Sequence, residues 1–161
     1  MSVGPPAEPA RPGCRAGYRG WVNPIRLIAL REAPLSVDEV QAAVMADEAG
    51  GIALFAGAVR DHDHGHPVTG LTYVAHPSAE AELHRVAAAV AEKYPAEGIA
   101  AVHRLGDLRI GELAVVVAVS CAHRGDALDA CRMLIDELKA TVPIWKHQRF
   151  EDGSSEWVGC A

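Results

Sequence analysis

Two lysines flank an apolar segment near the C-terminal end of the sequence, in the stretch LKATVPIWKHQ. Lys139 falls in the last turn of an expected helix, where a cation stabilises the carbonyl end of the helix dipole. Lys146 follows Ile144 and Trp145 in an extended segment, where the dipole offers no such explanation. A lysine that is partly desolvated beside other cations loses its proton more readily and can act as an acid, a base or a nucleophile. Both lysines are therefore candidate catalytic residues, although each alone could be a surface lysine with its ammonium group in water.

Basic side chains also follow three expected strands, which are GIALFAGAVR, GIAAVHR and ELAVVVAVSCAHR. These basic residues are Arg60, His103, Arg104, His123 and Arg124. Binding groups collect at strand ends and in the loops after them. The third strand leads directly into a helix, whose free N–H groups and positive dipole end favour an anion. We therefore expect these residues to share a phosphate or carboxylate site, with ordinary surface ion pairs as the alternative for each of them alone.

The segment DHDHGH, residues 61–66, alternates carboxylate and imidazole side chains. Such side chains are ligands for zinc-type metals. The spacing resembles a metallo-hydrolase signature only loosely, and no second set of ligands is obvious in the sequence. A polar loop that connects two strands is the simpler interpretation. We therefore expect no metal and no bound cofactor, with a metal-dependent hydrolase as the weaker alternative.

Composition narrows the class of protein. With 161 residues, half of them hydrophobic, the sequence predicts one globular domain. A formal net charge of −6 argues against a general nucleic-acid binder. The sequence contains neither an apolar run of roughly 18 residues nor a secretory leader, and its four cysteines form no CxxC pair. A reduced cytoplasmic protein is the expectation.

The elements that must position these residues follow from caps and periodicity. Residues 1–24, rich in Pro and Gly, predict a flexible extension, and residues 25–161 the folded domain. Strands are expected at 25–30, 51–60, 71–76, 98–108 and 112–124, with the last one central because it is the most apolar. The segments 51–60 and 71–76 are predicted to pair as a long-looped hairpin. A further short strand is expected near the C-terminal end.

Three helices are predicted. The first begins at Ser36, which forms a capping box with Glu39, and ends at Gly50. The second runs from Ser78 to about Tyr94. The third begins after a cap at Asp126 and is stopped by the proline at position 143. The expected buried residues of the second and third helices are Leu83, Val86, Ala87 and Val90, and Leu128, Cys131, Leu134, Ile135 and Leu138.

Six segments occur in an order and at separations typical of one family: FAGAVRDHDHG, LTYVAH, VHRLGDLRIGE, VVVAVSCAHR, ALDACRMLIDELKATVPIWKHQ and DGSSEWV. Together they resemble the large, catalytic subunit of molybdopterin synthase. The resemblance covers residues from about 25 to 158. It implies an α/β (α+β) hammerhead fold with a mixed, mainly antiparallel sheet and flanking helices.

The resemblance also implies an activity. Members of this family transfer sulfur from a thiocarboxylate, on the C-terminal Gly-Gly tail of a small ubiquitin-like carrier, to cyclic pyranopterin monophosphate, forming the dithiolene of molybdopterin. Two large subunits form the central homodimer of a heterotetramer. A non-catalytic partner-binding module with the same fold is the second alternative.

Site residues are implied position by position. Lys139 and Lys146 match the two functional lysines, and the sequence leaves open whether each acts as an acid, a base or a covalent nucleophile. The full substrate-binding set implied is Ala58, Val59, Arg60, His123, Arg124, Lys139, Lys146, His147 and Gln148, with His103 and Arg104 as possible supporting residues. Three positions depart from the family pattern. His147 and Gln148 replace a basic residue and a glutamate, so a carboxylate near the second lysine is missing, and Val74 replaces a common acidic residue.

Overall fold

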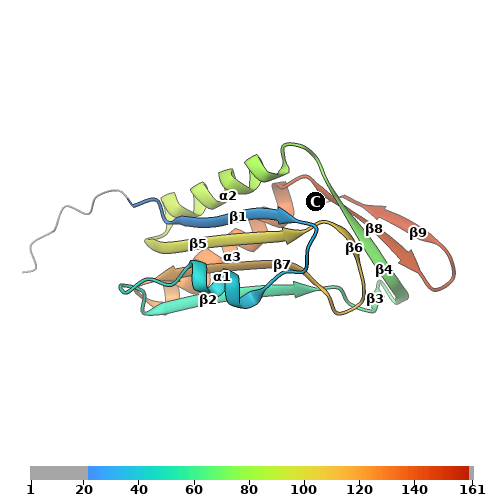
Figure 1. Ribbon diagram of the computed structural model, residues 1–161, viewed down its shortest axis with the longest axis horizontal. Helices are drawn as coiled ribbons and strands as arrows, with labels where there is room; N and C mark the ends of the chain where they lie inside the picture. The colour runs from blue at the N-terminus through green and yellow to red at the C-terminus, as the bar shows by residue number, and fades with distance from the viewer. Residues whose placement is uncertain (1–21, 160–161) are drawn as a thin grey trace, which may run out of the picture.

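The computed structural model describes residues 22–159, which form two sheets and three helices (Figure 1). The first sheet has the strand order β1-β5-β7-β2. The strands are β1 (Ile25–Arg31), β2 (Gly51–Ala58), β5 (Ala96–Arg104) and β7 (Leu113–Cys121). β1 and β5 are parallel, whereas β7 is antiparallel to both of its neighbours. This arrangement confirms the predicted mixed, mainly antiparallel sheet and the central place of the most apolar strand.

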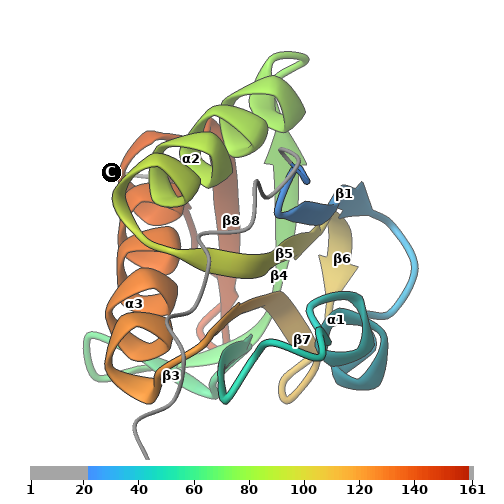
Figure 2. The same ribbon diagram turned by 90° about the vertical axis from the view of Figure 1, so that its left-hand side faces the viewer.

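Helices cover both faces of this sheet. α2 (Ala79–Lys93) and α3 (Arg124–Thr141) pack on one face and α1 (Val37–Ala43) on the other (Figure 2). Successive side chains of a strand point to opposite faces. Accordingly, Ile99 and Ala101 of β5 lie in the core under α2 and α3, and Ala100 and Val102 lie in the core under α1. Burial on both faces explains why β5 and β7 are apolar without alternation.

The second sheet contains five strands and is antiparallel throughout. It comprises β3 (His62–Asp63), β4 (His66–Ala75), β6 (Gly106–Leu108), β8 (Ile144–Phe150) and β9 (Ser155–Val158). Figure 1 shows this sheet at one end of the elongated molecule, where α3 ends and β8 begins. Val142 and Pro143 connect the two, so Lys139 and Lys146 lie on either side of a single junction.

The predicted pairing of segments 51–60 and 71–76 is wrong. β2 pairs with β7, and β4 pairs with β3, β6 and β8. The segment between β2 and β4 contains β3, which forms a tight hairpin with the start of β4. His64 (φ 48°) and Gly65 (φ 83°) form the two-residue turn between Asp63 and His66. Positive φ at both central residues matches the twist of a β-hairpin. Similarly, Gly106 (φ 80°) follows β5, and the single strand expected at 98–108 is two strands.

Two helix boundaries also differ from the predictions. Ser36 caps α1 by accepting a hydrogen bond from the Glu39 N–H at 3.2 Å, as expected, but α1 ends at Ala43 rather than Gly50. Val40 and Val44 bury their side chains against the sheet, and the following residues offer no further apolar side chain to that face. α3 begins at Arg124, earlier than the predicted cap at Asp126, and its N-cap is His123.

The buried face of α2 is the predicted one. On α3 the buried residues are Ala127, Ala130, Cys131, Leu134 and Leu138. Leu128 is 61% exposed, so its assignment to the core was wrong, and Ile135 is only partly buried. Near the start of α3 the buried side chains are Ala127 and Ala130 instead of Leu128.

Some expectations concern residues that the structure does not describe. Most of the predicted extension, residues 1–21, lies outside the described range, as do Cys14, Cys160 and Ala161. Cys121 and Cys131 are buried free thiols. Between residues 22 and 159, no helix is long and apolar enough to cross a membrane.

Candidate active site

The two lysines are linked by a row of side chains across both sheets. Lys146 of β8 pairs with Tyr73 of β4, which places their side chains on the same face. The Tyr73 ring meets the His103 ring edge-on, with 4.8 Å between centroids. The charge of Lys139 in turn acts on His103. The fold therefore brings the last turn of α3, the end of β5 and the middle of β8 into one site.

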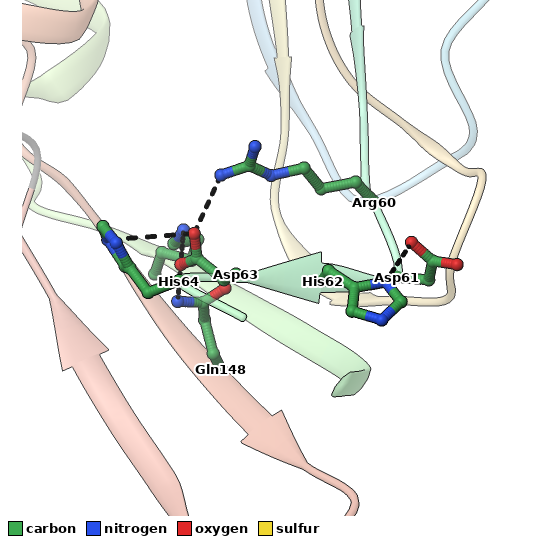
Figure 3. Close-up of polar contacts among 7 residues, drawn as sticks. Arg60, Asp61, His62, Asp63, His64 and Gln148 are labelled. Atoms are coloured by element: carbon green, nitrogen blue, oxygen red, sulfur yellow. Dashed lines mark hydrogen bonds and ion pairs between the residues drawn. The ribbon is translucent and has the colours of Figure 1, made fainter. Parts of the chain in front are cut away.

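Asp63, from the β3–β4 hairpin, lies beside Lys146 at one end of this row. Figure 3 shows Arg60, His64 and Gln148 around its carboxyl group. Its Oδ2 atom lies 3.5 Å from the Lys146 Nζ atom and accepts a hydrogen bond from Gln148 Nε2 at 2.5 Å. Its Oδ1 atom accepts a hydrogen bond from Arg60 at 2.8 Å, and His64 Nε2 lies 3.9 Å from the same oxygen. Four side chains from three segments thus converge on the carboxyl group of Asp63, a residue that is only 8% exposed.

These contacts keep Asp63 ionised. The hydrogen bond from Gln148 lowers the pKa of the Asp63 carboxyl most, and the positive charge of Lys146 lowers it further. Burial opposes both effects, since it disfavours the charged form. The net result is a pKa below the ordinary value, so a buried negative charge faces Lys146 at neutral pH.

His103 is fully buried and uncharged. Burial, and then the charge of Lys139, lower its pKa to about 4. Its Nδ1 atom lies 2.7 Å from the Arg104 carbonyl oxygen, which can only accept, so Nδ1 carries the proton. Nε2 is then a bare lone pair with no hydrogen-bond partner. His103 therefore supports the site without adding positive charge beside Lys139.

Arg104 points away from the lysines, because it follows His103 on the strand. It lines a hollow of about 550 Å³ together with Arg109, Arg149 and other residues, and neither lysine lines this hollow. Arg104 is 8% exposed, and its Nη1 atom has no hydrogen-bond partner. The predicted supporting pair is thus divided between two faces of β5.

The segment 58–60 reaches the site through its last residue. Ala58 ends β2 and is exposed, while Val59 is 4% exposed and held by backbone hydrogen bonds to Glu112 and Gly111. The Arg60 side chain is 76% exposed and is tied to the site only through Asp63. It is an exposed cation at the rim, suited to contact an anionic substrate.

His123 and Arg124 do not join the lysines within one chain, so a single chain does not bring all the basic strand ends together. β2 and β5 are antiparallel to β7, so the end of β7 lies beside the beginnings of its neighbours: Cys121 pairs with Gly51 and Ala96. Arg124 and Lys139 are fifteen positions apart on α3, which corresponds to about 22 Å along the helix axis. His123 and Arg124 are both exposed, at the end of α3 that lies far from Lys139.

His147 and Gln148 also separate. Gln148 is 3% exposed and belongs to the Asp63 cluster, which consists of Asp63 and its partners Arg60, His64, Lys146 and Gln148. His147 lies on the other face of β8, where its ring stacks on Trp157 with 4.4 Å between centroids and 13° between planes. Val74, at 43% exposure, lies on that outer face as well.

The His-Asp segment contributes a carboxylate rather than a metal site. His62 and His64 side chains are 60% and 90% exposed, and between residues 22 and 159 no group of three or more His, Cys, Asp or Glu side chains is placed to hold a metal ion. Asp63 was missed as a candidate site residue. Its only signal in the sequence was its place in a polar loop directly after Arg60.

Comparisons with known proteins agree with this architecture. The family model described as MoaE protein matches residues 30–141. Molybdopterin synthase catalytic subunit 1 of Mycobacterium tuberculosis is 44% identical over 154 residues, which is 95% of both chains. The catalytic subunit of a Nostoc species is 39% identical over 132 residues, covering 81% of this chain and 80% of the relative.

Solved structures give the same result. A crystal structure of molybdopterin synthase from Staphylococcus aureus has a TM-score of 0.76 and 34% identity, covering 83% of this chain and 97% of that one. A complex of subunits 1 and 2 of the molybdopterin-converting factor from Helicobacter pylori shares the fold, with a TM-score of 0.63 at 20% identity, covering 84% of this chain and 88% of that one.

Proposed function

This chain belongs to the MoaE family of molybdopterin synthase catalytic subunits, and we propose that the row from Lys139 to Asp63 is its sulfur-transfer site. The activity is transfer of sulfur from the thiocarboxylated C-terminus of a small carrier subunit to cyclic pyranopterin monophosphate, which forms the molybdopterin dithiolene. The observation that carries the proposal is the convergence of both lysines, Tyr73, His103 and the Asp63 cluster at one end of the molecule.

The groups present match the needs of this reaction. Attack of the thiocarboxylate sulfur on the pterin side chain requires proton transfer and a stabilised leaving oxygen. Lys146, 26% exposed and held beside Asp63, presents a cation to the developing negative charge. Lys139, next to an uncharged imidazole, can transfer a proton or react covalently with the carrier carbonyl. Arg60 at the rim is suited to the substrate phosphate.

The proposed partners are the small carrier subunit and a second copy of this chain. A carrier tail must reach the lysines from the surface, and the partial exposure of Lys139 and Lys146 leaves them accessible. The free thiols of Cys121 and Cys131 fit a reducing compartment, which supports a cytoplasmic location.

The homodimer accounts for His123 and Arg124. Since α3 separates them from the lysines by about 22 Å, they can reach substrate at a lysine site only if that site belongs to another copy. We assign them to substrate binding across the dimer interface. Mixed dimers of Lys146→Ala and Arg124→Ala chains test this assignment: each mixed dimer has one intact site, so activity returns on mixing. Activity that stays absent in verified mixed dimers would contradict the assignment.

The proposed function is tested by reconstitution. The purified chain is mixed with thiocarboxylated carrier and cyclic pyranopterin monophosphate, and dithiolene formation is measured as the molybdopterin produced. Product that forms only when all three are present supports the sulfurtransferase. Carrier binding without any product would instead favour the non-catalytic binding module.

A further inference from the structure

We propose that Asp63 is a positioning residue for Lys146, and that its carboxylate supplies the negative charge which holds the lysine ammonium group in the sulfur-transfer site. The proposal rests on the proposed function, because it assigns Asp63 a role in that reaction. Asp63 acts through Lys146 and is not itself assigned a contact with substrate.

The geometry assigns each carboxyl oxygen its own partners. Oδ2 faces β8, where it receives the Gln148 amide at 2.5 Å and lies 3.5 Å from the Lys146 ammonium nitrogen. Oδ1 faces the rim, where it receives Arg60 at 2.8 Å and has His64 at 3.9 Å. The oxygen nearest Lys146 is therefore fixed by a neutral amide, and the carboxylate charge is shared between Lys146 and the exposed Arg60.

The hairpin holds this carboxylate rigidly. Asp63 pairs with His66 across the two-residue turn, and Gln148 pairs with Leu71 on β4. A buried carboxylate is costly unless charges and hydrogen bonds compensate for its lost hydration. Here the Asp63 side chain is 9% exposed, the Lys146 side chain is 26% exposed and Gln148 is 3% exposed. Arg60, at 76% exposure, can leave Oδ1 for a substrate anion without uncovering Oδ2.

The charged and titratable groups that residues 22–159 place against this contact come from several elements of the same site. Arg60 approaches from the segment after β2, His64 from the hairpin turn and Lys146 from β8. Tyr73 of β4 lies across from Lys146, and beyond it lies uncharged His103. Asp63 is the one carboxylate among these named groups, so its removal leaves the cations without a counter-charge.

The competing explanation is that Asp63 only pins the hairpin to β8 through Gln148. An Asn side chain separates the two roles, because it keeps the size and can hydrogen-bond to Gln148 but carries no charge. Exchanging the two groups is a second, stronger variant: Asp63→Asn with Gln148→Glu returns a carboxylate to the other end of the same hydrogen bond, next to Lys146 on β8.

The experiment measures dithiolene formation with thiocarboxylated carrier against pH for wild type, Asp63→Asn, the double variant and Asp61→Asn. Asp61 is the matched control, since it lies on the same hairpin, is 72% exposed and contacts His62 instead. We expect kcat of Asp63→Asn to fall about tenfold or more with KM nearly unchanged, because a close charge contact is lost. The dependence of kcat on pH should change as well, because the charge beside Lys146 is lost.

The double variant should recover to within about threefold of wild type, and Asp61→Asn should match wild type. Wild-type kcat and pH profile in Asp63→Asn would overturn the positioning role, as would a folded double variant no better than Asp63→Asn. Melting temperature and carrier binding, measured for each variant, identify a loss of fold. An inactive wild type would instead refute the proposed sulfur transfer itself.

Discussion

The two lysines of the site have different known neighbours. Lys146 has a buried carboxylate 3.5 Å away, and that carboxylate is kept ionised by Gln148. Lys139 lies near His103, which is fully buried, uncharged at neutral pH and packed edge-on against Tyr73. Two identical side chains a few residues apart in sequence have thus been given different neighbours by different strands.

This difference suggests a division of roles. A lysine that is held by a fixed anion is positioned to stabilise negative charge that develops nearby. A lysine beside a desolvated, neutral imidazole meets no such counter-charge from that neighbour, which suits it to exchange a proton or form a covalent bond. The sequence distinguishes the two lysines only by their secondary structure, and the tertiary structure shows their different neighbours.

Arginine substitutions should sharpen the contrast most. Arginine keeps the charge and cannot give up its proton. Lys139→Arg should therefore lose about a hundredfold or more in product formation, the usual scale of lost acid–base catalysis. Lys146→Arg can still pair with Asp63 and should retain clearly more activity. Initial rates at saturating carrier measure both, and equal losses would remove the proposed division of roles.

His103 should reveal itself through the pH dependence of stability. Its pKa is about 4 in the folded chain and near 6.5 when unfolded, so below pH 6.5 the unfolded chain binds a proton that the folded chain does not. The His103 contribution to stability is thus fully present above pH 6.5 and is lost as pH falls towards 4. Between pH 7 and 5, wild type should lose about 2 kcal/mol more unfolding free energy than His103→Leu.

Urea unfolding at the two pH values measures this difference. His84→Gln, at an exposed position of α2, is the control and should show the wild-type change in unfolding free energy between pH 7 and 5. If the unfolding free energy changed equally with pH in wild type and His103→Leu, His103 would not be neutral in the folded protein.

Arg60 should give the smallest effect on stability and a selective effect on substrate. Its ion pair with Asp63 is largely exposed on the arginine side, so Arg60→Ala should change unfolding free energy by no more than about 0.5 kcal/mol. Loss of its phosphate contact should raise the KM for cyclic pyranopterin monophosphate by about tenfold. Arg85→Ala is matched, since Arg85 forms a similar exposed i,i+3 pair with Glu82, and it should leave KM unchanged. A KM shared by both variants would remove Arg60 from the substrate site.

Much of the fold was predictable because local signals determine it. The Ser36 cap, the buried stripe of α2 and the apolar β7 all follow from caps and periodicity. The pairing of β2 with β7 was not predictable. An apolar strand can pair with several other strands, and its sequence does not specify which one. The His64-Gly65 turn was hidden by the metal-like appearance of its neighbours.

The site residues were likewise predictable only where residue type and local sequence identify them. Both lysines and Arg60 were found from residue type and context, and the structure places them together. His123 and Arg124 were assigned to the same end because strand direction is invisible in the sequence, whereas antiparallel pairing puts them at the other end. Gln148 marked a missing carboxylate, and the structure supplies one from Asp63, which is 85 positions away.

The most direct test of the account is single-turnover dithiolene formation by Lys146→Ala, with carrier affinity measured on the same preparation. The account predicts that product formation falls by about a hundredfold or more, as expected for a lost electrostatic or proton-transfer group. Carrier affinity should stay within a few-fold of wild type. Full product formation by Lys146→Ala would contradict the assignment of sulfur transfer to this end of the molecule.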